Sequence, residues 1–143
     1  MIVNSEEVLP LRRFYAIIHI GGDIMKQNRN QTPEWYWNHG LHDAKIISAT
    51  KKESDWNPDD NCLIFKIDCD GAMFEADITE IRFYNFKIKT NDFDIKLLNG
   101  GWWLSDEVYE KGNHYFLDLK FDTAKCKTKH LELAFKKAEV IRL

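Results

Sequence analysis

Residues 114–121 read His-Tyr-Phe-Leu-Asp-Leu-Lys-Phe, and this stretch decides the fold class. Its apolar side chains of one parity are Tyr115, Leu117, Leu119 and Phe121. Most side chains of the other parity are polar. Because successive side chains of a strand point to opposite faces, this alternation predicts a half-buried β-strand.

The chain on both sides of this stretch has the same character. Leu63, Phe65, Ile67 and Cys69 alternate with more polar residues, and Leu131, Leu133 and Phe135 do the same near the end. Further strands are predicted at residues 42–51, 63–69, 73–89, 93–98, 102–104 and 130–135. Residues 136–143 either continue extended or form a last short strand, and residues 13–20 fit a strand better than a helix.

The segment 73–89 contains changes of phase. Phe74 and Ile78 share one parity, Ile81 and Phe83 take the other, and Ile88 returns to the first. A straight strand would place half of these side chains in water. Two bulges, or a break into two strands, would resolve the conflict.

One short helix is predicted within this β pattern. Thr32 is a suitable N-cap, Pro33 suits the first helical position, and Glu34 complements the helix dipole. Gly40 would end the helix, which gives a helix over residues 33–39. The polar stretches 26–32 and 51–61 are predicted loops, and the second is dense in turn-forming residues.

The expected fold class is therefore mainly β, or α+β with one short helix, arranged as an antiparallel β-sandwich or a curled antiparallel sheet. A length of 143 residues suits a single β-rich domain spanning 1–143. With 44% hydrophobic residues, the chain can bury a core without a disulfide or a structural metal.

The charge and the cysteine content limit the kinds of partner and the cellular compartment that are expected. The net charge is −3, and nucleic-acid binders usually carry a basic excess, so no nucleic-acid partner is expected. The lysines at 125, 127, 129, 136 and 137 are interpreted as solvated strand edges. Three cysteines make no even disulfide framework, and neither a secretion signal nor a membrane-spanning apolar run is visible. The expected location is the cytoplasm.

No complete catalytic motif is present. The nucleophile elbow and the phosphate-binding P-loop are absent, and no cysteine lies in a recognisable reactive context. His39, His42 and Asp43 are plausible ligands for a divalent metal, but the glycine between the histidines imposes no useful spacing. A structural role where the helix meets the sheet is favoured for them. No cofactor is expected.

The pair Trp102 and Trp103 suggests a surface for another protein. A regular strand would bury one of the two rings and expose the other. The alternative is that a loop covers both rings. An exposed Trp beside acidic residues and Tyr would form an aromatic, acidic surface, and binding hot spots are enriched in Trp and Tyr. The predicted partner-binding residues are Trp102, Trp103, Asp106, Glu107, Tyr109 and Glu110. Trp56, with Asp55, Asp59 and Asp60, is a smaller surface of the same kind.

The stretch Trp37-x-x-x-Leu41-His42-Asp43-Ala44-x-Ile46 resembles a motif of several families of small bacterial β-proteins. In these families an aromatic residue or Leu precedes His-Asp-Ala or His-Asp-Ser at the start of the first long strand. Some members are proposed immunity proteins of polymorphic toxin systems. The resemblance implies a non-enzymatic, partner-binding role, with His42 and Asp43 as a structural signature.

The leading hypothesis is a protein-binding domain, such as an immunity protein that neutralises a basic toxin through an acidic surface. A β-domain that binds a small ligand or a metal, with enzymatic activity, is the alternative. A third possibility is a structural or oligomeric domain. The sequence leaves the oligomeric state open.

Overall fold

The computed structural model describes residues 12–13 and 33–143. The predicted loop 26–32, and the predicted strand 13–20 beyond Arg13, lie outside these described residues. The strands are β1 (Arg12–Arg13), β2 (Lys45–Lys52), β3 (Cys62–Asp68), β4 (Ile78–Tyr84), β5 (Lys87–Ile88), β6 (Gly101–Lys111), β7 (His114–Asp122), β8 (Thr128–Phe135) and β9 (Lys137–Arg142). Two short 3₁₀ helices are η1 (Pro58–Asp60) and η2 (Ile95–Leu98).

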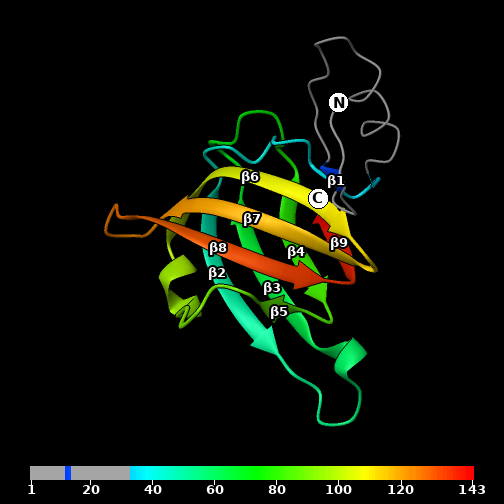
Figure 1. The fold of residues 1–143 in the computed structure, drawn as a ribbon. Helices are drawn as coiled ribbons and strands as arrows, with labels where there is room; N and C mark the ends of the chain where they lie inside the picture. The colour runs from blue at the N-terminus through cyan, green and yellow to red at the C-terminus, as the bar shows by residue number, and fades with distance from the viewer. Residues whose placement is uncertain (1–11, 14–32) are drawn as a thin grey trace.

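The strands form one antiparallel sheet in the order β5-β8-β7-β6-β2-β3-β4-β9, with β1 paired to β6. The sheet does not close on itself, because β5 and β9 are its two ends. Figure 1 shows how it curls, so that β6, β7 and β8 lie across β2, β3 and β4. The prediction of a mainly antiparallel fold is confirmed, in its curled-sheet form.

The seam between the two layers is short. Strands β2 and β6 pair only at Lys45–Trp102 and Ile46–Gly101. At Gly101 a Cβ atom would lie 2.4 Å from the carbonyl oxygen of Asp122, so only glycine lets the start of β6 approach the end of β7 this closely. Gly101 is also the partner of Ile46 in the short seam, so this position of the seam has no side chain.

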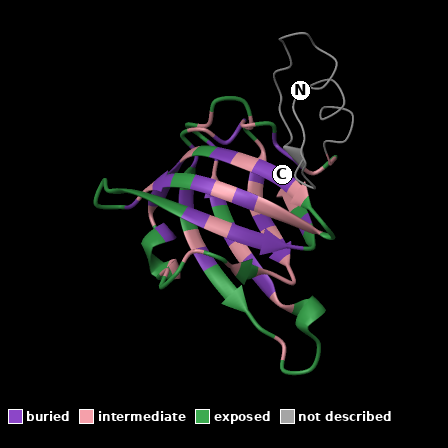
Figure 2. Cartoon of the chain, viewed as in Figure 1, coloured by how far each residue is buried: buried purple, intermediate pink, exposed green. Residues whose placement is uncertain are grey.

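The core fills the space inside the curl. Along most strands buried residues alternate with more exposed ones (Figure 2), as expected when one face of each strand is covered. The largest fully buried side chains are those of Trp103, Phe65, Phe83, Phe121, Phe135, Leu41, Ile46, Leu63, Ile78, Ile81 and Leu98. Both layers contribute to this set, so the layers share one core.

The predicted strand 73–89 is shorter in the structure, because residues 73–77 are irregular and Phe74 is exposed. In the rest of the segment, one register shift and one break resolve the phase changes. The β4–β9 register shifts between Ile78 and Glu80, so that Ile78 and Ile81 are both buried despite their opposite parity. The strand then breaks at Asn85, whose φ of 51° is left-handed, and β5 begins at Lys87. Within residues 136–143, the chain bends at Lys136 and Lys137–Arg142 form the last short strand, β9.

The predicted helix at 33–39 is wrong, and no α-helix occurs in the described residues. The segment folds into single turns, with hydrogen bonds from Tyr36 N to the Pro33 carbonyl and from Gly40 N to the Trp37 carbonyl. Asn38 and His39 have left-handed φ values of 50° and 64°, which no α-helix tolerates. Helical neighbours would point about 100° apart, whereas the turns bury Tyr36 and Trp37 together.

The predicted strand at 93–98 is also wrong. The side chain of Asp94 accepts a hydrogen bond from the Lys96 backbone N–H and caps η2. This local hydrogen bond competes with strand pairing, and the 3₁₀ turn still buries Leu98 fully. The β2, β3, β7 and β8 predictions agree with the structure to within a few residues at each end. None of the described helices is long and apolar enough to cross a membrane.

Candidate functional site

The adjacent tryptophans of β6 face opposite sides, as predicted. Trp103 is fully buried, whereas 42% of Trp102 is exposed. The Trp103 ring packs edge-on against Trp37 and Phe65, with centroids 5.4 and 5.9 Å away. Trp102 lies on the outer face, where the Lys45 ammonium is 5.7 Å from its ring centroid. Only Trp102 of this pair is available to a partner.

A bulge in β6 decides which face of the sheet the following side chains point to. The β6–β7 register shifts between Trp103 and Ser105, so the inward-facing parity changes at Leu104. Asp106 then points into the core on the same side as Trp103, and it is buried. Without the bulge, residues 103 and 106 would face opposite sides of the sheet.

The predicted surface over residues 102–110 is therefore not one exposed face. Trp103, Asp106 and Tyr109 are buried, while Trp102, Glu107 and Glu110 retain exposed area. Tyr109 stacks on Phe116 with ring centroids 5.1 Å apart, and its hydroxyl donates to a Glu132 carboxylate oxygen at 2.8 Å. The bulge is the physical reason for this correction, because it turns the acid that was expected outside into the core.

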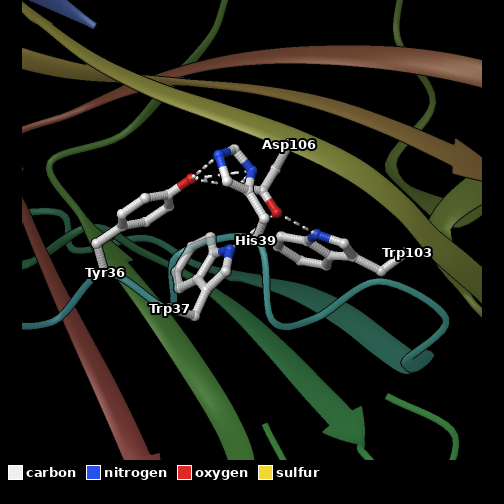
Figure 3. Close-up of polar contacts among 5 residues, drawn as sticks. All are labelled: Tyr36, Trp37, His39, Trp103 and Asp106. Atoms are coloured by element: carbon white, nitrogen blue, oxygen red, sulfur yellow. Dashed lines mark hydrogen bonds and ion pairs between the residues drawn. The ribbon is translucent and has the colours of Figure 1, made fainter. Parts of the chain in front are cut away.

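Asp106 is the centre of a buried polar cluster (Figure 3). Its Oδ2 accepts from the indole N–H groups of Trp37 at 2.9 Å and Trp103 at 2.8 Å. Its Oδ1 accepts from the Tyr36 hydroxyl at 3.0 Å. One carboxylate thus holds donors from two distant parts of the chain, the turn segment and β6. We call these residues, with His39, the Asp106 cluster.

His39 is the solvent-facing member of the Asp106 cluster. Its Nδ1 lies 3.6 Å from Asp106 Oδ1, and both ring nitrogens lie 3.2 Å from the Tyr36 hydroxyl oxygen. Its side chain is 40% exposed, whereas that of Asp106 is 1% exposed. The left-handed backbone at Asn38 and His39 turns this ring toward the carboxylate. His39 therefore links the buried acid to water.

Burial controls the acid–base behaviour of the cluster. Removal from water raises the pKa of Asp106, although the donors from Trp103, Trp37 and Tyr36 oppose that shift. Burial and the nearby Asp106 charge also raise the pKa of Tyr36, so this hydroxyl stays protonated and remains a donor. The cluster has the geometry of a buried structural hub that ties the turn segment to β6.

The raised pKa of Asp106 predicts a specific pH dependence of stability. The folded chain takes up a proton at higher pH than the unfolded chain, whose Asp titrates near about 3.9. We therefore expect the free energy of unfolding of the parent, minus that of Asp106→Asn, to rise as pH falls from 7 toward about 4. Urea unfolding at each pH measures this difference. A His39→Gln background keeps the imidazole from contributing charge, and a difference that falls on acidification would contradict the prediction.

The three predicted metal ligands do not converge. His42 Nδ1 lies 3.1 Å from Asp43 Oδ2, while His39 turns away toward Tyr36 and Asp106. Across residues 33–143 no group of three or more His, Cys, Asp or Glu side chains is arranged to hold a metal ion. The space beside Gly40 is occupied, because a Cβ there would lie 2.7 Å from Glu75 Cγ. The structural role favoured for His42 and Asp43 stays a prediction.

A second candidate site lies on the outer face of β3 and β4. The loop after β2 borders a groove of about 630 Å³, whose lining includes Lys52, Glu53, Asp55, Trp56, Asp60, Arg82 and Tyr84. The Trp56 side chain is 94% exposed, more than any other large aromatic ring of the described residues. We call this the Trp56 groove.

The loop that carries Trp56 is held by its own hydrogen bonds. Ser54 Oγ accepts from the backbone N–H groups of Trp56 and Asn57, both at 3.2 Å. Asn57 caps η1 by accepting from the Asp59 N–H at 3.0 Å, and Asn61 accepts from the Ser54 N–H at 2.7 Å. The ring is thus presented to solvent by an ordered loop.

No protein-family model, no curated protein and no solved structure matches this chain. The resemblance to the immunity-protein families therefore stays a prediction.

Sequence reasoning missed the Asp106 cluster and ranked the Trp56 groove second. An acidic residue three positions after a Trp, together with a second aromatic-rich segment, was the available signal for the cluster. That signal could not be read without the bulge at Leu104 and the turns at 33–43. For the Trp56 groove, the sequence signal was Trp56 next to Asp55, Asp59 and Asp60. These four residues lie in one turn-rich loop.

Proposed function

We propose that this chain is a non-enzymatic protein-binding domain that engages a basic partner through the Trp56 groove. The observation that carries the proposal is a Trp side chain 94% exposed on an ordered, acidic loop. Exposing a large apolar ring costs solvation free energy, and aromatic rings with this exposure are typical of binding anchors. A partner that covers the ring would recover that free energy.

Charge around Trp56 determines the kind of partner. Glu53, Asp55, Asp59 and Asp60 lie within eight residues. The groove lining itself holds three of these acids and two basic residues, Lys52 and Arg82, so acidic side chains are in excess. Among the described residues, Glu53, Asp55 and Asp60 make no ion pair, so their charges are available. A Lys or Arg of the partner could pack on the indole face and pair with these carboxylates. A cation–π contact of this kind contributes about 0.5–2 kcal/mol.

The loop that borders the groove is also preorganised for binding. The hydrogen bonds of Ser54, Asn57 and Asn61 fix the loop, and Asn85 on the neighbouring segment donates to Asp59 Oδ1 at 2.6 Å. Binding to a loop that is already ordered avoids most of the entropy cost of ordering it. The acidic surface would further speed encounter with a basic protein by electrostatic steering.

Toxin neutralisation in the cytoplasm is the specific form of this activity that we propose. A basic toxin offers the cationic surface that the Trp56 groove would cover, and binding alone would suffice to block it. The resemblance of residues 37–46 to the immunity-protein motif supports this role. None of residues 37–46 lines the groove, so in this proposal the motif acts structurally and not at the interface.

The test uses the purified chain as bait in lysate of its source organism, followed by affinity measurements with the isolated partner. We expect Trp56→Ala to weaken binding by about 30- to 100-fold, as for the loss of a hot-spot aromatic. Asp55→Lys with Asp60→Lys should slow association and weaken its salt dependence.

Trp102→Ala is the matched control, because this ring is also exposed but lies on β6, opposite Lys45 of β2 and outside the groove lining. It should change the affinity by less than about threefold. Equal partner affinity of Trp56→Ala and the parent would exclude the groove as the interface. A basic partner that loses affinity only with Trp102→Ala would move the interface to the β2–β6 seam.

A further inference from the structure

A basic pocket lies between η2 and the turn that joins β7 to β8. Its volume is about 370 Å³. It is lined by Lys96, Leu97, Asn99, Thr123, Ala124, Lys125, Lys127 and Lys129. In Figure 1 the β7–β8 turn and η1 lie at different ends of the molecule, so this pocket is separate from the Trp56 groove. We call it the lysine pocket.

Four of the eight lining residues are lysines, and none is acidic. All four lysines are exposed, and none makes an ion pair with a carboxylate of a described residue. The chain as a whole carries a net charge of −3, so this concentration of positive charge is local. Like charges held close together repel, and a bound anion would relieve that repulsion.

The remaining polar side chains of the lysine pocket can also donate. Asn99 Oδ1 accepts from the Ala49 N–H at 2.9 Å, which leaves the amide NH₂ as a donor. Thr123 is buried and its Oγ1 accepts from the Lys125 and Lys127 N–H groups at 3.3 and 3.2 Å, while its hydroxyl can still donate one hydrogen bond. Ammonium, amide and hydroxyl donors together are the groups that bind phosphate oxygens.

The volume of the lysine pocket and the net charge of the chain indicate which kind of anion would bind. A pocket of about 370 Å³ admits a small molecule with one or two phosphate groups, and Leu97 and Ala124 offer apolar surface to the rest of it. A long nucleic acid would extend beyond the pocket over a surface whose net charge repels it. We propose that the lysine pocket binds a small phosphorylated ligand through Lys96, Lys125, Lys127 and Lys129.

The experiment titrates the full chain with inorganic pyrophosphate at constant ionic strength and follows backbone amide chemical shifts. We expect saturable binding with a dissociation constant below about 1 mM. The shifts should centre on residues 96–99 and 123–129. Lys125→Gln with Lys127→Gln should weaken binding at least tenfold, because two of the four charges are removed.

Lys51→Gln with Lys66→Gln is the control, since both lysines are exposed, lie outside the pocket and remove the same net charge. It should leave the affinity within twofold, and urea unfolding checks that both double variants fold. Equal weakening by the two double variants would overturn the proposal, as would the absence of saturation. A nucleoside diphosphate and an oligothymidylate complete the set of probes. Tighter binding of the oligothymidylate than of the diphosphate would also overturn it, in favour of a nucleic-acid surface.

Discussion

Asp106→Ala is expected to destabilise the fold by about 3–5 kcal/mol. The substitution leaves three buried donors, the indole N–H groups of Trp37 and Trp103 and the Tyr36 hydroxyl, without their acceptor. Each buried donor left without a partner costs about 1–3 kcal/mol. Desolvation of the carboxylate offsets part of this cost in the parent, which places the sum below the upper limit. The shift in urea midpoint at pH 7 measures the loss.

Two related variants separate hydrogen bonding from charge. Asp106→Asn keeps an oxygen that can accept from both indole groups, and its amide can donate to the Tyr36 oxygen, so we expect a loss of about 1–2 kcal/mol. Asp55→Ala changes an exposed Asp with no described ion pair and should cost less than about 0.5 kcal/mol. Equal losses for Asp106→Ala and Asp55→Ala would show that the cluster contributes nothing to stability.

Trp103→Ala is expected to cost about 3–5 kcal/mol, the range for truncating a fully buried large aromatic side chain. The ring fills the space between Trp37 and Phe65, so its removal leaves a cavity at the centre of the curl. It also removes one of the three donors to Asp106. Thermal and urea unfolding measure the effect, with circular dichroism in the far and the near ultraviolet as the two probes.

The neighbouring residue supplies the control for this prediction. Trp102→Ala removes a ring of the same size from the outer face, where it is partly exposed, and should cost less than about 1 kcal/mol. Trp103→Phe retains an aromatic core side chain but loses the indole donor, so an intermediate loss of about 1–2 kcal/mol is expected. If Trp102→Ala were as destabilising as Trp103→Ala, the assignment of inner and outer faces along β6 would be wrong.

The sequence predicted the sheet well because strand alternation records burial directly. Residues 63–69 and 114–121 alternate without interruption, and they became β3 and β7. The phase changes in 73–89 predicted an irregularity, and the structure places both a register shift and a break there. In each case the information lies in neighbouring residues, so no distant contact is needed to read it.

The two wrong elements share a cause. Residues 33–39 carry a good helix start, and residues 93–98 have strand-like composition, yet both form turns. In the first segment, Tyr36 and Trp37 gain more from reaching Asp106 and the core than the backbone gains from two helical turns. In the second, the Asp94 cap and the burial of Leu98 stabilise η2. Local propensity was outweighed by tertiary contacts.

The candidate sites show the same division. Trp56 among acidic residues could be noticed in the sequence, because a short loop keeps its members together. The lysines at 125, 127 and 129 were interpreted as a solvated edge, and the approach of Lys96 and Asn99 from η2 turns that edge into a pocket. The contact between η2 and the β7–β8 turn joins segments about 30 residues apart. The alternation of apolar and polar residues along one strand does not predict such a contact.

By itself the sequence determined the antiparallel β class, the positions of its most regular strands and the opposite orientation of Trp102 and Trp103. These properties follow from the period of two along a single strand. The tertiary structure alone decided the path of 33–43, the inward turn of Asp106 and the pairing of η2 with the β7–β8 turn. Each of these depends on a bulge, a left-handed residue or a contact between distant segments, where the free energy of burial outweighs local preference.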